Sequence, residues 1–188
     1  MATMNAAEVG VGSAKATGAI YVAPQGTTLP TDATTTLPTS AWKLLGFTSD
    51  AGVTISESVS TDEIRAWEGR STVYTVTTEY TESVACTPIQ CNGDVAKLTW
   101  GDDAVTVDSQ TGAIHAAHSG KNMEPVCICV ETTPRDDIVK RYCGTFQLTE
   151  RGEQTMDGTQ VEGRSLTFNA VADSNGVTMH EYTAFITD

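Results

Sequence analysis

The stretch from Ser71 to Cys86 alternates its side chains in the manner of a single β-strand about 16 residues long. Strands in globular proteins usually run about 5–6 residues. Its even-numbered positions are mostly apolar or aromatic and carry one charge, Glu82, whereas its odd-numbered positions are mostly polar and include Glu79. We expect one face to pack on a core and the other to meet water or a wet interface. A strand this long must bend sharply, or project beyond its own domain and find a neighbour.

A tight turn precedes this strand and makes it one half of a hairpin. Asp62–Trp67 is predicted as the partner strand, with Glu68-Gly69-Arg70 as the turn, because glycine adopts turn conformations at little cost. Trp67 at the strand end has two interpretations. It is either a core aromatic or an anchor between subunits, since tryptophan is enriched at protein interfaces. The hairpin as a whole predicts an interaction surface and not a catalytic site.

Strand patterns recur along the rest of the chain, without the spacing of β-α-β units. The further predicted strands are 17–23, 42–47, 53–59, 104–107, 113–116, 126–131, 138–150, 160–171 and 177–186. One helix is predicted at Gly93–Trp100, with Asn92 as its N-cap and Gly101 just after its end. Asn175-Gly176, between the last two strands, predicts a hairpin there. These patterns predict a mainly β fold, an antiparallel β-sandwich or partly open barrel with one flanking α-helix.

The N-terminal part of the chain differs in composition from the rest. Residues 1–16 are poor in apolar bulk, so we expect a flexible N-terminal arm, and residues 17–188 are expected to form a single β domain. Within that domain a long loop is predicted at about 24–41, where prolines interrupt regular structure. Loops of this length are uncommon unless they are functional or are ordered by a partner.

Charge and cysteine content limit the classes of function. The chain has 24 acidic and 11 basic residues and a formal net charge of −13, which argues against a nucleic-acid-binding surface, since that needs clustered Lys and Arg. No basic and then apolar leader is recognisable at the N-terminus, and no run of about 18 apolar residues is present, so we expect neither secretion nor a membrane span. Five cysteines, an odd number, are expected to be reduced thiols of a protein made in a cytoplasm.

Two groups of residues raise the question of a metal site. His115 and His118 are separated by two alanines, and Cys127 and Cys129 by one isoleucine. Structural zinc sites usually have two to four residues between cysteines or three to five between histidines. Asp102, Asp103 and Asp108 lack the ligand spacing of a calcium-binding EF-hand loop. We therefore expect no bound metal, and ordinary surface histidines, packed thiols and solvated aspartates in its place.

The sequence also gives little indication of a catalytic site. Cys143 has basic neighbours but no positioned base to activate its thiol. The adjacent pairs Asp62-Glu63 and Asp136-Asp137 cannot act on one substrate from a strand, because neighbouring strand residues point to opposite faces. No glycine-rich segment lies between a strand and a helix in the order that a phosphate-binding loop requires. The sequence predicts that the protein is not an enzyme and uses no cofactor.

Four segments, in their order and spacing, carry a resemblance to a known family: Gly18–Pro24, Gly26–Ala33, Leu45–Thr54 and Asp62–Gly69. Together they resemble the major tail tube protein of long-tailed, siphovirus-type bacteriophages, especially phages of actinobacteria. The resemblance covers roughly residues 17 to 101, and the remainder agrees in length and strand character.

The resemblance implies a fold of two packed antiparallel sheets with a flanking helix, and a structural virion protein of the phage tail. It implies that six copies form a ring, that rings stack into a hollow tube, and that strands of neighbouring subunits join into one β-barrel around the lumen. DNA would pass through without specific binding. The implied partners are further copies of the chain, the tape measure protein inside the tube, the tail terminator and the tail-tip proteins. Assembly would take place in the cytoplasm of the bacterial host.

Candidate residues for these roles follow from combining the resemblance with the strand pattern. The polar face of the long strand supplies candidates for the lumen wall: Thr75, Thr77, Glu79 and Thr81. The turn, the first strand and the long loop supply candidates for contacts between subunits: Tyr21, Pro24, Leu29, Pro30, Arg65 and Trp67. A secreted or surface β-sandwich module that binds a glycan or a protein is the alternative function.

Overall fold

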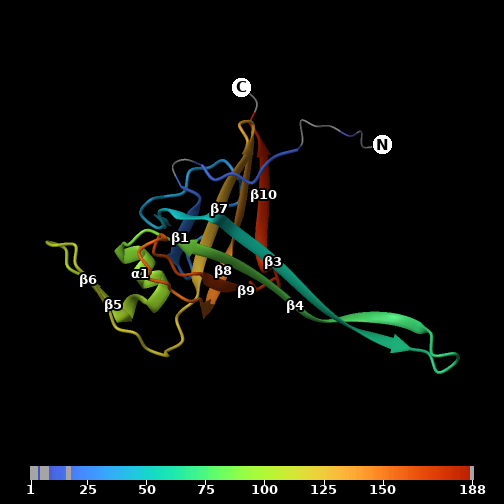
Figure 1. Cartoon of the computed structure of the whole chain (residues 1–188). Helices are drawn as coiled ribbons and strands as arrows, with labels where there is room; N and C mark the ends of the chain where they lie inside the picture. The colour runs from blue at the N-terminus through green and yellow to red at the C-terminus, as the bar shows by residue number, and fades with distance from the viewer. Residues whose placement is uncertain (1–3, 5–8, 16–17, 187–188) are drawn as a thin grey trace.

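The structure, a computed structural model, describes residues 4, 9–15 and 18–186 and is dominated by one antiparallel sheet of eight strands (Figure 1). The strand order is β2-β1-β7-β8-β9-β4-β3, and β10 pairs with β8. The strands of this sheet are β1 (Ile20–Pro24), β2 (Lys43–Leu44), β3 (Thr48–Arg65), β4 (Thr72–Pro88), β7 (Val126–Arg135), β8 (Ile138–Arg151), β9 (Leu166–Val171) and β10 (Met179–Phe185). The predicted mainly β, antiparallel fold is confirmed, and the sheet does not close into a barrel within the described residues.

The remaining elements flank this sheet. Helix α1 (Gly93–Trp100) is followed by a short 3-10 turn, η2 (Asp102–Ala104), and by a two-stranded hairpin of β5 (Val105–Val107) and β6 (Ile114–Ala116). The predicted helix is confirmed in place and in capping. The Asn92 side chain accepts a hydrogen bond of 2.7 Å from the Val95 amide, and the Gly101 amide donates to Lys97 at 2.7 Å.

Two apolar clusters lie on opposite faces of the sheet. The inner cluster joins β1, β7, β8, β9, the base of β4 and α1, and contains Ile20, Leu45, Val84, Ile128, Phe146, Leu166 and Phe168. The outer cluster joins β1, β7 and β8 to the long loop after β1, and contains Leu37, Trp42, Cys127, Cys129 and Cys143. Adjacent strand residues point to opposite faces, so the continuous apolar run of β7 serves both clusters at once.

The hairpin predicted at Asn175-Gly176 is wrong. A tight turn is present, since the Asp173 amide donates to Val177 and the Gly176 amide to Asp173. However, β9 pairs with Thr145–Arg151 of β8, and β10 pairs with Ile138–Gly144 of the same strand. The two strands therefore follow each other in the same direction along one edge of β8. The seven residues between them form a loop that leaves this edge and returns to it. The 14-residue length of β8 offers enough edge for both strands, and this long-range pairing overrides the local signal.

Several predicted strands are also longer than the strands in the structure. The strand predicted at 160–171 begins only at Leu166, and the one predicted at 42–47 has two residues.

Of the predicted N-terminal arm, the structure describes residues 4 and 9–15, and the others lie outside the described residues. The Val11 amide donates to Pro134 at 2.9 Å, and the Thr133 amide donates to Ser13 at 2.8 Å, so this segment runs along the end of β7. Its flexibility stays a prediction.

The five cysteines occur as separate thiols, with Cys91 exposed and the other four buried. Burial raises the pKa of the Cys86 thiol to about 12 and that of Cys143 to about 11, and it also raises the pKa of Cys129. The reactive thiolate form is therefore scarce at neutral pH at these three positions.

We expect iodoacetamide at pH 7.5 to modify Cys91 alone in the folded protein and all five thiols after unfolding in urea, without any reductant. Mass spectrometry of both samples would count the adducts. Rapid modification of two or more thiols in the folded protein would contradict the packing of the inner and outer clusters. A shortfall of two in urea would reveal a disulfide and favour the secreted-module alternative.

Candidate assembly surfaces

A two-stranded hairpin of β3 and β4 projects from the body of the molecule (Figure 1). Only its base joins the core: Val84 and Cys86 are buried, and Val53 and Ile55 pack partly against them. From residue 56 to residue 81 every side chain is exposed except Ala66, which is half-buried. The predicted long strand is confirmed. The expectation that one face of it packs along a core holds for the base alone, because nothing in the chain covers the outer part.

Several cross-strand pairs of the hairpin join residues of the same kind. Val59 lies opposite Tyr80 and Ile64 opposite Tyr74, all of them large exposed side chains. Ser60 lies opposite Glu79, whereas Asp62 is an exception and lies opposite Val76. Cross-strand pairs of this kind give the hairpin a sidedness even where no core supports it.

A register shift divides the hairpin into a base half and a tip half. Ser60 pairs with Glu79 whereas the next residue, Thr61, pairs with Thr77, so Thr78 is an extra residue in β4. An inserted residue interrupts the alternation of its strand and re-aims the side chains beyond it. The predicted single polar face is therefore not continuous. Glu79 and Thr81 share a face of the base half, Thr75 and Thr77 share a face of the tip half, and Thr78 separates the two pairs. All four are exposed, and their placement at the lumen stays a prediction.

The tip of the hairpin carries the most exposed large hydrophobic side chain of the described residues from 9 to 186. Gly69 and Arg70 both have positive φ, 67° and 52°, and the Ala66 amide donates to Ser71 across the turn. Trp67 stands in this turn with a relative exposure of 94%. The interpretation of Trp67 as a core aromatic is thus wrong. Arg65 is bound within the chain, since its guanidinium donates to Glu63 at 2.9 Å, and Thr72 donates to the same carboxylate at 3.0 Å.

The long loop after β1 packs against its own chain, so no partner is needed to order it. Tyr21 and Leu29 pack against the outer cluster, and the Pro30 carbonyl accepts from the Cys143 thiol at 3.7 Å. Pro24 is exposed at the end of β1. The candidates for subunit contacts therefore lie in three places: the hairpin tip, the end of β1 and the half-buried inner side of the loop.

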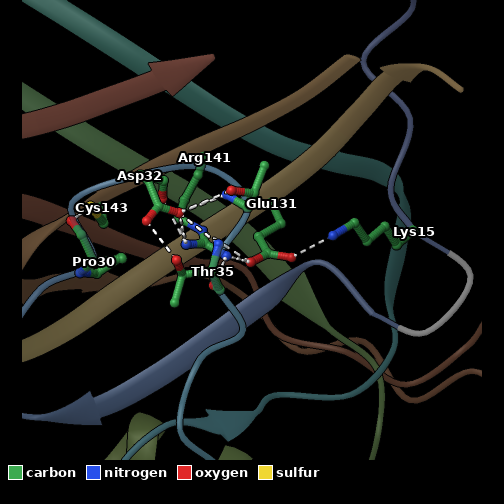
Figure 2. Close-up of polar contacts among 8 residues, drawn as sticks. Lys15, Pro30, Asp32, Thr35, Glu131, Arg141 and Cys143 are labelled. Atoms are coloured by element: carbon green, nitrogen blue, oxygen red, sulfur yellow. Dashed lines mark hydrogen bonds and ion pairs between the residues drawn. The ribbon is translucent and has the colours of Figure 1, made fainter. Parts of the chain in front are cut away.

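A buried ionic cluster holds this loop on the sheet (Figure 2). Arg141 of β8 is 1% exposed and lies opposite Glu131 of β7, to which its Nε donates at 3.0 Å. Its two terminal nitrogens donate to the carbonyls of Asp32 and Thr35 at 2.7 and 2.8 Å, and Lys15 Nζ lies 3.0 Å from the other Glu131 oxygen. Hydrogen bonds from Thr35 and Thr34 lower the pKa of Asp32 to about 2.

Sequence reasoning missed this cluster, although a signal for it exists. Arg141 alternates with Val139 and Cys143, both buried, so a charge occupies the apolar side of a strand. A charge in such a position needs a partner of opposite sign, and Glu131 follows directly on the apolar run of the preceding strand. The arrangement fixes structure and leaves no open ligand position, since all buried side-chain N and O atoms of the described residues have hydrogen-bond partners.

The residues weighed for chemistry are dispersed. His118 stacks on Trp100, with ring centroids 3.5 Å apart, and His115 lies exposed on β6. Asp108 accepts hydrogen bonds from the amides of Gln110 and Thr111, which lowers the pKa of its carboxyl group and marks it as a turn residue. Across the described ranges, no three His, Cys, Asp or Glu side chains are grouped as metal ligands, and no helix has the length and apolar character of a membrane span.

A family model described as "Phage tail tube protein" matches residues 2–184. The chain belongs to the phage tail tube protein family. The resemblance seen in four short segments is confirmed over nearly the whole chain, and the protein is a structural component of the virion tail, of a family that forms the tail tube and is not a family of enzymes. No curated protein matches the chain.

Proposed function

We propose that this protein assembles into six-membered rings, that the rings stack into a hollow tube, and that phage DNA passes through the tube without specific binding. The projecting hairpin carries the proposal. Two-stranded hairpins are marginal in water by themselves, and exposed apolar side chains in a row mark an interaction surface. A hairpin in which both faces are exposed over residues 56–81 gains stability when neighbouring copies cover it.

The charge of the hairpin region favours a passage for DNA over a binding site for it. Residues 50–86 contain seven carboxylates and two arginines, a net charge of −5. Repeated around a ring, such a wall repels phosphate, so the DNA can slide without sticking. We place the polar side of the base half, with Glu79 and Thr81, at the lumen. Thr75 and Thr77 lie on the opposite side of the paired strands, so they line the lumen as well only if the hairpin twists through half a turn between base and tip.

Further copies of the chain are the first partners of this assembly. A tape measure protein in the lumen, a tail terminator at one end and tail-tip proteins at the other complete the proposed set, and assembly in the host cytoplasm accords with the cysteines being separate thiols. Electron microscopy of the purified protein, combined with light scattering, tests the core of the proposal. Six-fold rings or tubes of uniform diameter support it, and a monomer at all concentrations overturns it.

We expect Glu79→Lys to assemble normally but to slow DNA ejection. The substitution would add six positive charges to each six-membered ring and attract phosphate within a Debye length, about 8 Å at physiological salt. Tube formation by microscopy and ejection from phage particles carrying the variant are the two measurements. Glu79→Gln is the matched control, because it removes the carboxylate without adding a positive charge. Loss of ring formation would place Glu79 in a subunit interface, and normal ejection would place it on the outer surface.

A further inference from the structure

A groove of about 960 Å³ opens on the body of the molecule between α1, the end of β1 and the segment 117–126. Its apolar lining includes Val22, Leu98, Trp100, Met123, Pro125 and Val126. One wall is braced from behind, because Arg151 donates to the Thr99 carbonyl at 2.6 Å and its guanidinium carbon lies 5.1 Å from the Trp100 ring centroid. The groove is therefore a preformed apolar recess, of the kind that accepts a large side chain.

The hairpin tip cannot reach this groove in its own chain. Figure 1 shows α1, β5 and β6 at one side of the body and the hairpin leaving from the other. About ten residues of each strand extend beyond the base, which at about 3.3 Å per residue carries the tip roughly 30 Å outward. The hairpin tip and the groove therefore lie at opposite ends of the molecule. A contact between them joins two copies head to tail, and contacts of that type build closed rings or open stacks.

Charges around the tip and around the groove are complementary. Glu68 and Arg70 flank Trp67, and neither has an ion-pair partner in the part of the chain that the structure describes. The groove is rimmed by Lys43 and Lys121 and by acidic side chains, Asp94, Asp103 and Glu124, which are likewise without ion-pair partners among the described residues. In a chain with a net charge of −13, contacts between copies are repulsive unless opposite charges meet. The tip offers charges of both signs, and so does the rim.

We propose that Trp67 of one copy inserts into the groove between α1 and segment 117–126 of a second copy, with Glu68 and Arg70 meeting the lysines and aspartates of the rim. This inference rests on the proposed self-assembly and adds the pair of surfaces that meet. Burying an exposed tryptophan in an apolar pocket gives the signature of an interface hot spot. At about 960 Å³ the groove has the volume of a pocket for a drug-sized ligand, which is larger than an indole ring.

The first test replaces Trp67 by alanine. Because Trp67 is 94% exposed, the variant should keep the circular dichroism spectrum and melting temperature of the parent at low concentration. We expect its critical concentration for assembly, measured by light scattering, to rise about 30-fold or more, the factor that corresponds to the loss of a hot spot. Trp67→Phe should recover part of the loss. An unchanged critical concentration for Trp67→Ala overturns the insertion, while assembly of the parent protein still upholds the proposed function.

The second test asks where the tip lies. In a Cys91→Ser background, one sample carries Ser71→Cys beside the tip and another carries Ser119→Cys, a residue lining the groove. Assembled together and treated with a short bifunctional maleimide, the two should give a cross-linked dimer. Ser174→Cys, exposed in the loop between β9 and β10, replaces Ser119→Cys as the control and should give at least tenfold less product. Tubes that cross-link equally through residue 174, or not at all through residue 119, refute the groove. Mixtures that form no tubes refute the proposed function itself.

Discussion

Replacing Arg141 by methionine should lower the free energy of unfolding by about 3–5 kcal/mol. The substitution keeps much of the apolar length of the side chain but removes the guanidinium that Glu131 and the carbonyls of Asp32 and Thr35 share. Glu131, only 4% exposed, then keeps Lys15 as its remaining ionic partner, and two loop carbonyls lose their donors. Removing one member of a buried ion pair costs far more than the pair itself contributes. Urea unfolding of the unassembled protein measures the difference.

A double variant separates this cause from loss of packing. Arg141→Met combined with Glu131→Gln removes the uncompensated charge, so we expect it to recover at least half of the stability lost by Arg141→Met alone. Lys140→Met is the matched surface control. Lys140 is the neighbouring residue on β8, and its ion pair with Glu181 is partly solvent-exposed, so its loss should cost about 1 kcal/mol or less. A double variant no more stable than the single one would assign the effect to the loop carbonyls and not to Glu131.

Tyr74→Lys should abolish tube formation at concentrations at which the parent protein assembles fully. Tyr74 is 64% exposed, pairs with Ile64, and belongs to the apolar side of the tip half. In the proposed assembly this side lies against a neighbouring copy, so a lysine there would be desolvated, and even with Asp62 on the same side of β3 its burial would cost several kcal/mol for each contact. Sedimentation of tubes and microscopy measure the outcome.

The adjacent residue supplies the control for this variant. Thr75→Lys adds the same charge one position along, on the opposite face of the strand and across from Glu63. We expect tubes to form from it in normal yield. If both lysines block assembly, the whole tip is enclosed by neighbouring copies. If neither does, the exposed apolar side chains of the hairpin do not mediate association.

The sequence predicted those features that short-range patterns determine. The long strand, its turn, and the helix with both of its caps were confirmed, since alternation and capping depend on residues only a few positions apart. The hairpin at Asn175-Gly176 was wrong because its outcome depends on a strand more than 20 residues away. Both β9 and β10 pair with β8, so the turn between them does not produce a hairpin.

The candidate surfaces likewise have features that short-range patterns predicted and features that depend on pairing between distant residues. Alternation alone indicated which side chains lie on each side of a strand, but it could not reveal that Thr78 is extra, because only the pairing with β3 shows it. Trp67 was ambiguous for a related reason. An aromatic residue at a strand end is buried or exposed according to where the strand ends in space, and the hairpin ends far from the core. Arg141 and Glu131 lie 10 residues apart in sequence but directly opposite in the sheet, so neither residue identifies the other until the register is known.

The extra residue at Thr78 constrains how the length of this hairpin can change in evolution. Side chains alternate with a period of two, so gaining or losing two residues in each strand moves the tip outward or inward and leaves its faces where they were. A one-residue insertion in β3 opposite Thr78 would be different in kind. Thr78 would then have a partner, strict alternation along β4 would be restored, and the tip would be turned over relative to the base, exchanging the side with Tyr74 for the side with Thr75. Tail tube genes that diverge from this one should therefore vary the hairpin by even numbers of codons in each strand, and β3 should not gain the single residue that pairs with Thr78.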